Sequence, residues 1–453
     1  MQTLAASMAR FIAGLNLTIL PSEVVEKAKA CLLNAYGMGL NGYDTPYAPV
    51  ARAAAVALDG EVARGATLLG DGRRTTIGGA CLANSALFHG RAQEDTCGAA
   101  HFGTVLVPLL TAMIETRHYP IGRLLPALVA GYEAGGLLEK AYADRTTPGG
   151  FRSSAIYGTI AAAAAAGKLM ELEEAQLGAA LANAVSFTGG VLQSFSDGTD
   201  EWRYQVGAVA RNGLLAAELA RAGSIAAPHA FEGKTGFIAS FARANREVAG
   251  LADRLGQEWA TLRVTFKPYP VCAFNQTPVT AALALRRELG AAAIRAVRVR
   301  MNPFETGYAG MDATGPFNSI SGTLMSIPFC IATALIHGVP DTRAMTTYND
   351  AAVNDLVTGV ELISDNAVPI LSAIIEVETT DGRVQRRNQQ MTAADYAYDR
   401  AAVATLVRDI GVKQDLPPRA FDLLERFVEQ LPDSAIDDVL ASYGMLPAIR
   451  PVQ

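Results

Sequence analysis

Apolar residues recur at helical spacing through about the first 250 residues of the chain. Segment 23–40 carries them on one face, at Val24, Ala28, Cys31, Leu32 and Ala35. The same spacing predicts further helices at 3–20, 50–58, 77–88, 106–115, 123–142, 154–170, 173–184 and 206–222. Because many of these positions are alanine, neighbouring helices can approach closely, and the pattern predicts an all-α region.

The pattern changes near residue 260, where apolar and polar residues begin to alternate. The stretches TLRVTFKPYP at 261–270 and AVRVRMNP at 296–303 predict strands, and residues 373–388 predict a β-hairpin. Helices are predicted between these strands, at 277–289, 321–337 and 350–360. This part of the chain is therefore expected to form a smaller α+β domain.

Helical spacing returns after residue 393, with predicted helices at 418–430 and 433–443. We therefore predict a mainly α fold, in which an all-helical domain is formed by N- and C-terminal segments around an inserted α+β domain. The expected helical domain consists of residues 1–262 and 394–453, and the inserted domain of residues 263–393.

The charge balance excludes several classes of partner. The chain has 38 basic and 44 acidic residues, a formal net charge of −6, and no basic run, so neither nucleic acid nor an anionic membrane is an expected partner. Only 18% of the residues are charged while 50% are hydrophobic. We interpret this balance as burial of a helical interface in a homo-oligomer, although a large core accounts for part of it.

Nothing in the sequence predicts export or a membrane span. The N-terminus has no continuous apolar core followed by a cleavage site, and no apolar run reaches the length of a spanning helix. Five scattered cysteines without a CxxC pair fit a reducing compartment and argue against a structural zinc or iron–sulfur site. A cytoplasmic location and no bound metal are therefore expected.

The candidate chemistry is concentrated in one polar loop, within FHGRAQEDTCGAAHFGTVLVP at 88–108. This loop carries Glu94, Asp95, Thr96, Cys97 and His101. Its glycines predict that the backbone leaves helical geometry between two apolar helices, and such loops often carry catalytic residues. The alternative interpretation is a solvated connection between helices.

Seven segments carry a resemblance to one known family, and they follow one another in that family's order: PSEVVEKAKACLLNAYGMGLNG, HGRAQEDTCGAAHFGTVLVP, RSSAIYGTIAAAAAAGKLMEL, GAVARNGLLAAELARAG, AFEGKTGF, FKPYPVCAF and SIPFCIATALIHG. On these segments the chain resembles the MmgE/PrpD family, which includes 2-methylcitrate dehydratase, cis-aconitate decarboxylase and iminodisuccinate epimerase. The resemblance implies a helical domain with an inserted α+β lid, a homodimer, and activity without a cofactor.

The resemblance also implies which residues form the site. The family's loop His matches His101, its Thr matches Thr96, the Lys that opens the lid matches Lys267, and its lid Tyr matches Tyr308. Other positions depart from the family. An Asp is replaced by Ala92, a His by Arg152, a Lys by Trp202, a second His by Gln276, and a His after the Thr by Cys97.

Family members remove a proton next to a carboxylate or return one to such a carbon. His101 is the expected base, because imidazole titrates near neutral pH. Lys267 and Arg152 are expected to hold carboxylates, and Asp95 to orient His101 or neutralise a cation. Tyr308 or Cys97 is the expected acid. The further residues expected to contact the substrate are Thr96, Ser153, Trp202, Arg203 and Gln276.

Each of these residues also has a structural interpretation. Asp95 can be a helix N-cap, Lys267 a hinge residue, Tyr308 a packing residue, and Arg203 a partner of nearby acids. The other histidines lack a supporting cluster in the sequence and are expected to be surface or structural residues. They are His89, His118, His229 and His337.

We therefore expect a lyase or dehydratase that acts on a small organic acid less polyanionic than methylcitrate. An epimerase or isomerase, a cyclase, or a catalytically silent family member are the alternatives. The enzyme interpretations share one expectation, that the imidazole of His101 and the ammonium of Lys267 face a common cavity.

Overall fold

The computed structural model describes residues 2–447. The chain divides into two compact units. The helical unit is the described part of 1–191, 203–266 and 397–453, and the α+β unit consists of 192–202 and 267–396. The main α+β segment begins four residues after the expected residue 263 and ends three residues after the expected residue 393. The segment 192–202, which was expected in the helical domain, groups with the α+β unit instead.

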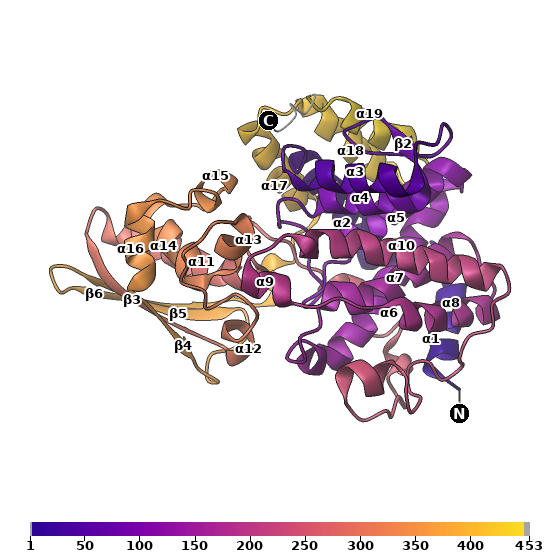
Figure 1. Cartoon of the computed structure of the whole chain (residues 1–453), viewed down its shortest axis with the longest axis horizontal. Helices are drawn as coiled ribbons and strands as arrows, with labels where there is room; N and C mark the ends of the chain where they lie inside the picture. Colours follow the sequence, from indigo (N-terminus) through magenta and orange to yellow (C-terminus); the bar gives the residue numbers. More distant parts are fainter. Residues whose placement is uncertain (1, 448–453) are drawn as a thin grey trace. The chain divides into compact units, whose positions relative to one another are not determined.

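The helical unit contains the long helices that the apolar spacing predicts, except that the first one ends at Gly14 and not at the predicted residue 20 (Figure 1). From the N-terminal part these are α1 (Leu4–Gly14), α2 (Ser22–Asn41), α3 (Tyr47–Asp59), α4 (Ile77–Phe88), α5 (Gly103–Arg117), α6 (Leu124–Thr146), α7 (Ser153–Leu169), α8 (Glu174–Phe187) and α10 (Glu201–Arg221). The C-terminal part adds α17 (Arg400–Lys413), α18 (Pro418–Glu429) and α19 (Ile436–Gly444). A two-stranded ribbon joins β1 (Ala66–Thr67) to β2 (Arg74–Thr75). Single short turns complete this unit, at η1 (Ile121–Arg123), η2 (Ile238–Ala242), η3 (Ala252–Arg254) and η4 (Thr261–Arg263).

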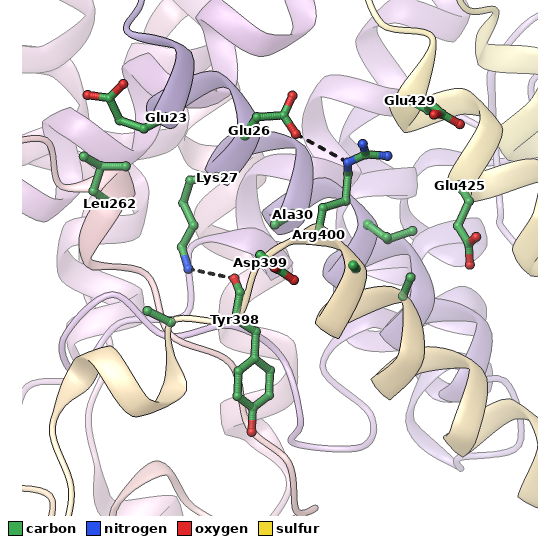
Figure 2. A pocket seen from close by; sticks show the side chains of 14 residues that line it. Glu23, Glu26, Lys27, Ala30, Leu262, Tyr398, Asp399, Arg400, Glu425 and Glu429 are labelled. Carbon is green, nitrogen blue, oxygen red and sulfur yellow. Dashed lines mark hydrogen bonds and ion pairs between the residues drawn. The ribbon is translucent and has the colours of Figure 1, made fainter.

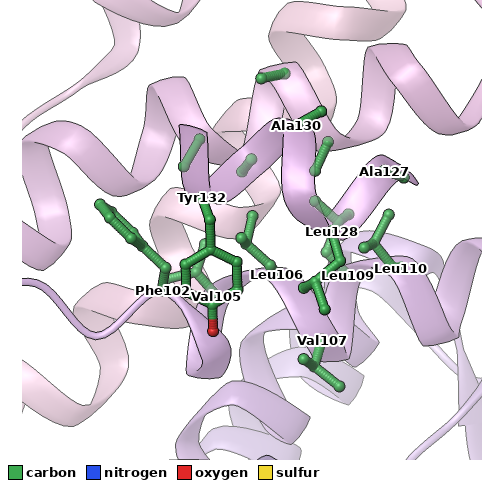
Figure 3. Packing of buried hydrophobic residues seen from close by; sticks show 14 of the residues in the cluster. Phe102, Val105, Leu106, Val107, Leu109, Leu110, Ala127, Leu128, Ala130 and Tyr132 are labelled. Atoms are coloured by element: carbon green, nitrogen blue, oxygen red, sulfur yellow. The ribbon is translucent and has the colours of Figure 1, made fainter. Parts of the chain in front are cut away.

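Small residues bring the central helices together. A methyl group added at Gly135 of α6 would collide with the methyl group of Ala161 on α7, so these helices pack at a distance that only small residues permit. Larger side chains fill the neighbouring layer. Figure 3 shows Leu106, Leu109 and Leu128 among the buried side chains contributed by α5 and α6. The predicted close packing of Ala-rich helices is confirmed.

The C-terminal helices complete the helical unit. Asn41 at the end of α2 donates a hydrogen bond of 2.9 Å from Nδ2 to the carbonyl oxygen of Val407 in α17. The Tyr443 hydroxyl of α19 donates one of 2.8 Å to the carbonyl oxygen of Tyr36. Gly37 faces Val407 at a contact too close for a side chain. The predicted return of the chain to its first domain is therefore confirmed.

The α+β unit is built on a four-stranded sheet with strand order β4-β3-β5-β6 (Figure 1). Its strands are β3 (Ile294–Met301), β4 (Val360–Ser364), β5 (Ser372–Thr379) and β6 (Val384–Gln390). β3 pairs parallel with β4 and antiparallel with β5, and β5 and β6 form the predicted hairpin. The helices of this unit are α9 (Gln193–Asp197), α11 (Gln276–Leu289), α12 (Pro303–Thr306), α13 (Ile320–Met325), α14 (Ile327–His337), α15 (Thr342–Met345) and α16 (Ala351–Thr358). Two 3₁₀ turns, η5 (Ala273–Asn275) and η6 (Ala393–Tyr396), complete it.

One predicted strand is wrong. Residues 261–270 form no strand, and only Thr265 makes a single bridge, with Thr96. Pro268 and Pro270 have no backbone N–H for a ladder, and the segment begins with the 3₁₀ turn η4. The actual fourth strand, β4, was not predicted.

Among residues 2–447, no helix combines the length and the apolar character that crossing a bilayer requires.

Candidate active site

The loop between α4 and α5 is held in an irregular shape by its surroundings. Ala92 and Gly98 both have positive φ, at 58° and 60°. The turn around Gly98 is closed by hydrogen bonds between the backbones of Cys97 and Ala100. Glu139 of α6 accepts a hydrogen bond of 2.9 Å from the Ala99 N–H, and a side chain at position 98 would collide with its carboxylate. The loop is therefore fixed to a rigid helix, as a catalytic loop requires.

His101 lies between the loop backbone and a buried carboxylate. Its Nδ1 is 2.9 Å from the carbonyl oxygen of Asp95 and 3.5 Å from Oε1 of Glu94. Because a carbonyl oxygen can only accept, Nδ1 carries the proton and the lone pair of the neutral ring is on Nε2. The backbone N–H of His101 donates to the Ser154 hydroxyl oxygen at 3.0 Å, which fixes the residue against the start of α7.

Glu94 connects His101 to a second histidine. Its Oε2 lies 3.1 Å from Nδ1 of His89, off the line of an ideal hydrogen bond. On the other side of that ring, Nε2 of His89 is 2.7 Å from Nη2 of Arg152. The two imidazole rings are 5.5 Å apart, centroid to centroid. The side chains of Glu94 and His89 are almost completely buried, whereas that of His101 is 17% exposed.

The carboxylate of Asp95 contacts the start of α5 and a tyrosine of α6, and its negative charge acts on the ammonium of Lys27. It accepts a hydrogen bond of 2.5 Å from the Tyr132 hydroxyl and one of 3.1 Å from the Gly103 N–H. Burial, and next the charge of Asp95, raises the pKa of Tyr132 well above its ordinary value. Asp95 thus orients His101 through its backbone carbonyl, while its carboxylate fixes the start of α5. It is not an N-cap, because Phe102 holds that position.

The other loop residues predicted for the site have structural partners. The Thr96 hydroxyl lies 2.7 Å from the Thr265 hydroxyl, beside two backbone hydrogen bonds between these residues. The thiol of Cys97 faces the carbonyl oxygen of Ala260 at 3.6 Å, and burial raises its pKa far above the ordinary value. A thiol held protonated in this way is a poor acid, so the structure does not favour Cys97 as the proton donor.

Three predicted residues lie at the start of α7 and α10. Arg152 donates to His89 and, at 3.3 Å, to Oε1 of Gln205. The Ser153 hydroxyl is buried and has no hydrogen-bond partner among residues 2–447. Arg203 is buried and its guanidinium lies 3.8 Å from the centre of the Tyr47 ring.

The remaining predicted residues belong to the α+β unit. Lys267 is the first residue of its main segment. The indole nitrogen of Trp202 donates to the Ser321 hydroxyl at 3.1 Å. The Tyr308 ring packs edge-on against Phe274, with their centroids 5.3 Å apart.

Gln276 has a structural role within its own unit. Its amide nitrogen donates to the carbonyl oxygens of Tyr269, Val271 and Cys272, and its amide oxygen accepts from the Tyr269 N–H. These bonds hold the loop at 269–272 against the start of α11. Gln276 thus has a structural role that is independent of the substrate contact expected for it.

The α+β unit also contains a buried acid that the sequence did not indicate. Glu305 of α12 accepts a hydrogen bond of 3.0 Å at Oε1 from the Leu371 N–H. Its Oε2 has no hydrogen-bond partner in the described part of the chain. Burial raises the pKa of Glu305 from 4.5 to about 7.

Sequence reasoning missed His89 and Tyr132, and it named Glu94 in the loop without assigning it a role. The expectation that His89 lacks a supporting cluster is wrong, because it contacts both Glu94 and Arg152. The available signal was weak: His89 follows α4 directly and lies five residues before Glu94 in a loop with several glycines. Tyr132 lies within a long apolar helix, where nothing in the sequence distinguishes it from core residues.

A separate cleft of about 820 Å³ lies on the helical unit between α2, α17 and α18 (Figure 2). Lys27 donates from Nζ to the carbonyl oxygen of Tyr398 at 3.3 Å, and burial lowers its pKa. Arg400 and Glu26 form an ion pair at its rim. None of the site residues predicted from the sequence lines this cleft. No set of three or more His, Cys, Asp or Glu side chains within residues 2–447 is arranged to hold a metal ion.

Comparison with known proteins identifies several similar chains. The cis-aconitate decarboxylase-like protein oryM of Aspergillus oryzae is 29% identical over 279 residues, which cover 58% of this chain and 57% of that protein. A cis-aconitate decarboxylase of Aspergillus terreus is 28% identical over 358 residues, with 73% and 71% covered. The human cis-aconitate decarboxylase is 27% identical over 298 residues, with 64% and 61% covered. The chain thus spans about 57% of the length of the first of these relatives and 61% of the human one.

The two domain models that describe one protein family together match most of the chain. The MmgE/PrpD N-terminal domain matches residues 6–247, and the MmgE/PrpD C-terminal domain matches residues 269–399. Their order and their extents agree with the helical and α+β units described above. The chain belongs to the MmgE/PrpD family.

Proposed function

We propose that the protein is a lyase that removes a proton next to a carboxylate or carbonyl group of a small organic acid. The observation that carries this proposal is the contact of His101 with both the Asp95 carbonyl oxygen and the Glu94 carboxylate. Relatives named cis-aconitate decarboxylases support a lyase reaction.

The geometry suits His101 to the role of base. With its proton held on Nδ1, the neutral ring has its lone pair on Nε2, the nitrogen remote from Asp95 and Glu94. When Nε2 takes a proton from carbon, the ring becomes an imidazolium. The buried Glu94 carboxylate then stabilises that positive charge at short range.

His89 is not suited to act as a second base. Its Nε2 faces the guanidinium of Arg152, which can only donate, and its Nδ1 faces Glu94. A two-base epimerisation through both histidines therefore has no support in the geometry. For this reason we favour either proton removal from carbon followed by loss of the hydroxyl group as water, or loss of carbon dioxide followed by addition of a proton to the resulting carbanion.

The substrate is proposed to be an acid with fewer carboxylates than methylcitrate. The departure from the family at Trp202 supports this choice, since an apolar indole stands where the family has a Lys that could hold a carboxylate. The roles of Lys267 as a carboxylate ligand and of Tyr308 as an acid remain predictions from the resemblance.

A substrate screen tests the proposal. The purified protein is incubated with hydroxy acids and unsaturated mono-, di- and tricarboxylic acids, including cis-aconitate and methylcitrate, and products are followed by NMR. We expect turnover of at least one mono- or dicarboxylate, abolished in His101→Gln and retained in His118→Gln, which alters an exposed histidine at the end of α5. Equal turnover by His101→Gln would refute the proposed base. Efficient turnover of methylcitrate or cis-aconitate would refute the proposed substrate class.

A further inference from the structure

The buried side of the loop contains a series of polar contacts that leads to Glu94, and the proposed mechanism uses only Glu94 at its end. It runs from Gln205 to Arg152, from Arg152 to His89, and from His89 to Glu94. Each of Arg152, His89 and Glu94 is at least 99% buried. Charged and polar groups this deeply buried are costly unless they are paired, so their arrangement has a physical consequence.

The donor and acceptor pattern fixes the proton on His89. Every nitrogen of a guanidinium is a donor, so the 2.7 Å contact with Arg152 requires an accepting lone pair on Nε2 of His89. The proton of the neutral ring must then be on Nδ1, the nitrogen that faces Glu94 at 3.1 Å. A second proton on this ring would place an N–H directly against the guanidinium.

We propose that His89 and Arg152 are positioning residues that hold Glu94 ionised and directed at His101. In this arrangement the positive charge of Arg152 lies on the side of His89 that is remote from Glu94. The neutral His89 ring lies between them, with its lone pair toward Arg152 and its N–H toward Glu94. Glu94 faces Nδ1 of His89 with one oxygen, at 3.1 Å, and Nδ1 of His101 with the other, at 3.5 Å. The inference deepens the proposed function and rests on it for its catalytic consequence.

The arrangement changes the role expected for Arg152. A guanidinium that holds a substrate carboxylate presents two parallel N–H groups to it. Here the two terminal nitrogens of Arg152 are directed to His89 and Gln205, inside the helical unit. Arg152 is therefore assigned to the protein's own base and not to the substrate. A substrate then has one carboxylate ligand fewer than the sequence suggested, in agreement with the proposed substrate class.

The tautomer can be measured without knowing the substrate. The protein has five histidines, so nitrogen NMR of imidazole-labelled protein, assigned with single His→Gln variants, resolves each ring. We expect His89 to hold its proton on Nδ1 and to remain neutral from pH 6 to pH 8. Arg152→Met should mix the two tautomers of His89, whereas Arg152→Lys should largely retain the Nδ1–H form. Arg145→Met, which removes an exposed guanidinium from the last turn of α6, serves as the control.

Two substitutions of His89 separate its contacts. In His89→Asn the amide nitrogen takes the place of Nδ1 and can still donate to Glu94, whereas in His89→Gln the amide oxygen takes the place of Nε2 and can still accept from Arg152. On a substrate found in the screen, we expect His89→Asn to retain more of kcat than His89→Gln. Arg152→Met should lower kcat at least tenfold and shift its pH profile, with KM changed less than threefold.

The outcomes distinguish this inference from the proposed function. A proton on Nε2 of His89, or an unchanged His89 tautomer in Arg152→Met, overturns the positioning role. A rise in KM for Arg152→Met with unchanged kcat and pH profile assigns Arg152 to the substrate and also overturns it. If His89 shows the expected tautomer but no acid is turned over, the proposed function fails while the positioning geometry stands.

Discussion

Replacing Glu94 by Gln tests the proposed base most quantitatively, because it removes one charge and retains the shape of the side chain. Glu94 Oε1 lies 3.5 Å from Nδ1 of His101. Two unit charges at that separation attract by about 5 kcal/mol at an effective dielectric constant of 20. If the proton is about half transferred in the transition state, about 2 kcal/mol of this attraction is lost, which corresponds to a roughly thirtyfold fall in kcat.

The assay is the initial rate on the acid that the screen identifies, with KM measured alongside. We expect kcat of Glu94→Gln to fall and KM to change little, because the lost charge acts on the imidazolium and not on the bound acid. Glu247→Gln removes an exposed carboxylate elsewhere in the helical unit and should retain the full rate. A Glu94→Gln protein that is folded and as fast as the unaltered enzyme would refute the electrostatic argument.

Three further substitutions have expected outcomes. Tyr132→Phe removes the 2.5 Å hydrogen bond to the buried carboxylate of Asp95. This should lower the free energy of unfolding, measured by urea denaturation, by about 2 kcal/mol. An unchanged free energy of unfolding would mean that the hydrogen bond contributes nothing to stability. Gly98→Ala should lower the melting temperature and the activity, because position 98 has φ 60° and a side chain there would collide with Glu139. The control Gly382→Ala, at φ 85° in an open turn, introduces the backbone strain without a collision and should keep full activity. Equal loss of activity in both variants would contradict this account. Burial raises the pKa of Glu305 from 4.5 to about 7, so between these pH values the folded chain retains a proton that the unfolded chain releases. The free energy of unfolding should therefore fall by up to about 3 kcal/mol as the pH rises from below 4.5 to above 7. Glu305→Gln should remove this part of the pH dependence in denaturation measured at pH 5 and pH 8, and an unchanged difference between the two pH values would show that another group is responsible.

Local periodicity predicted much of the fold. Segment 77–88 was predicted as a helix and α4 has the same bounds, because its spacing and its Thr76 cap are local features. The hairpin of β5 and β6 was also predicted, from alternation on both sides of a glycine turn. Strand β4 was missed because its five residues follow α16 almost without a break, and its identity as a strand depends on pairing with β3.

The sequence predicted where the candidate site lies but not which of its side chains contact one another. The loop with Asp95 and His101 stood out by its residue types, and the structure places both together. Which acid faces the imidazole depends on the backbone path, including the positive φ of Ala92, and this path brought Glu94 to the ring instead of the Asp95 carboxylate. The partner of Arg152 follows from the meeting of the end of α4 with the start of α7, which no local pattern contains.

The central claim is that His101, supported by Glu94, accepts a proton from carbon. The most direct test is deuterium incorporation in D₂O at the carbon next to the carboxylate of an acid that the protein turns over, followed by proton NMR under conditions where product is converted back. We expect exchange with the unaltered protein and at least a hundredfold slower exchange with His101→Gln, in keeping with the roughly 10²- to 10⁴-fold contribution of a general base. Exchange at an undiminished rate in a folded His101→Gln protein would contradict the account.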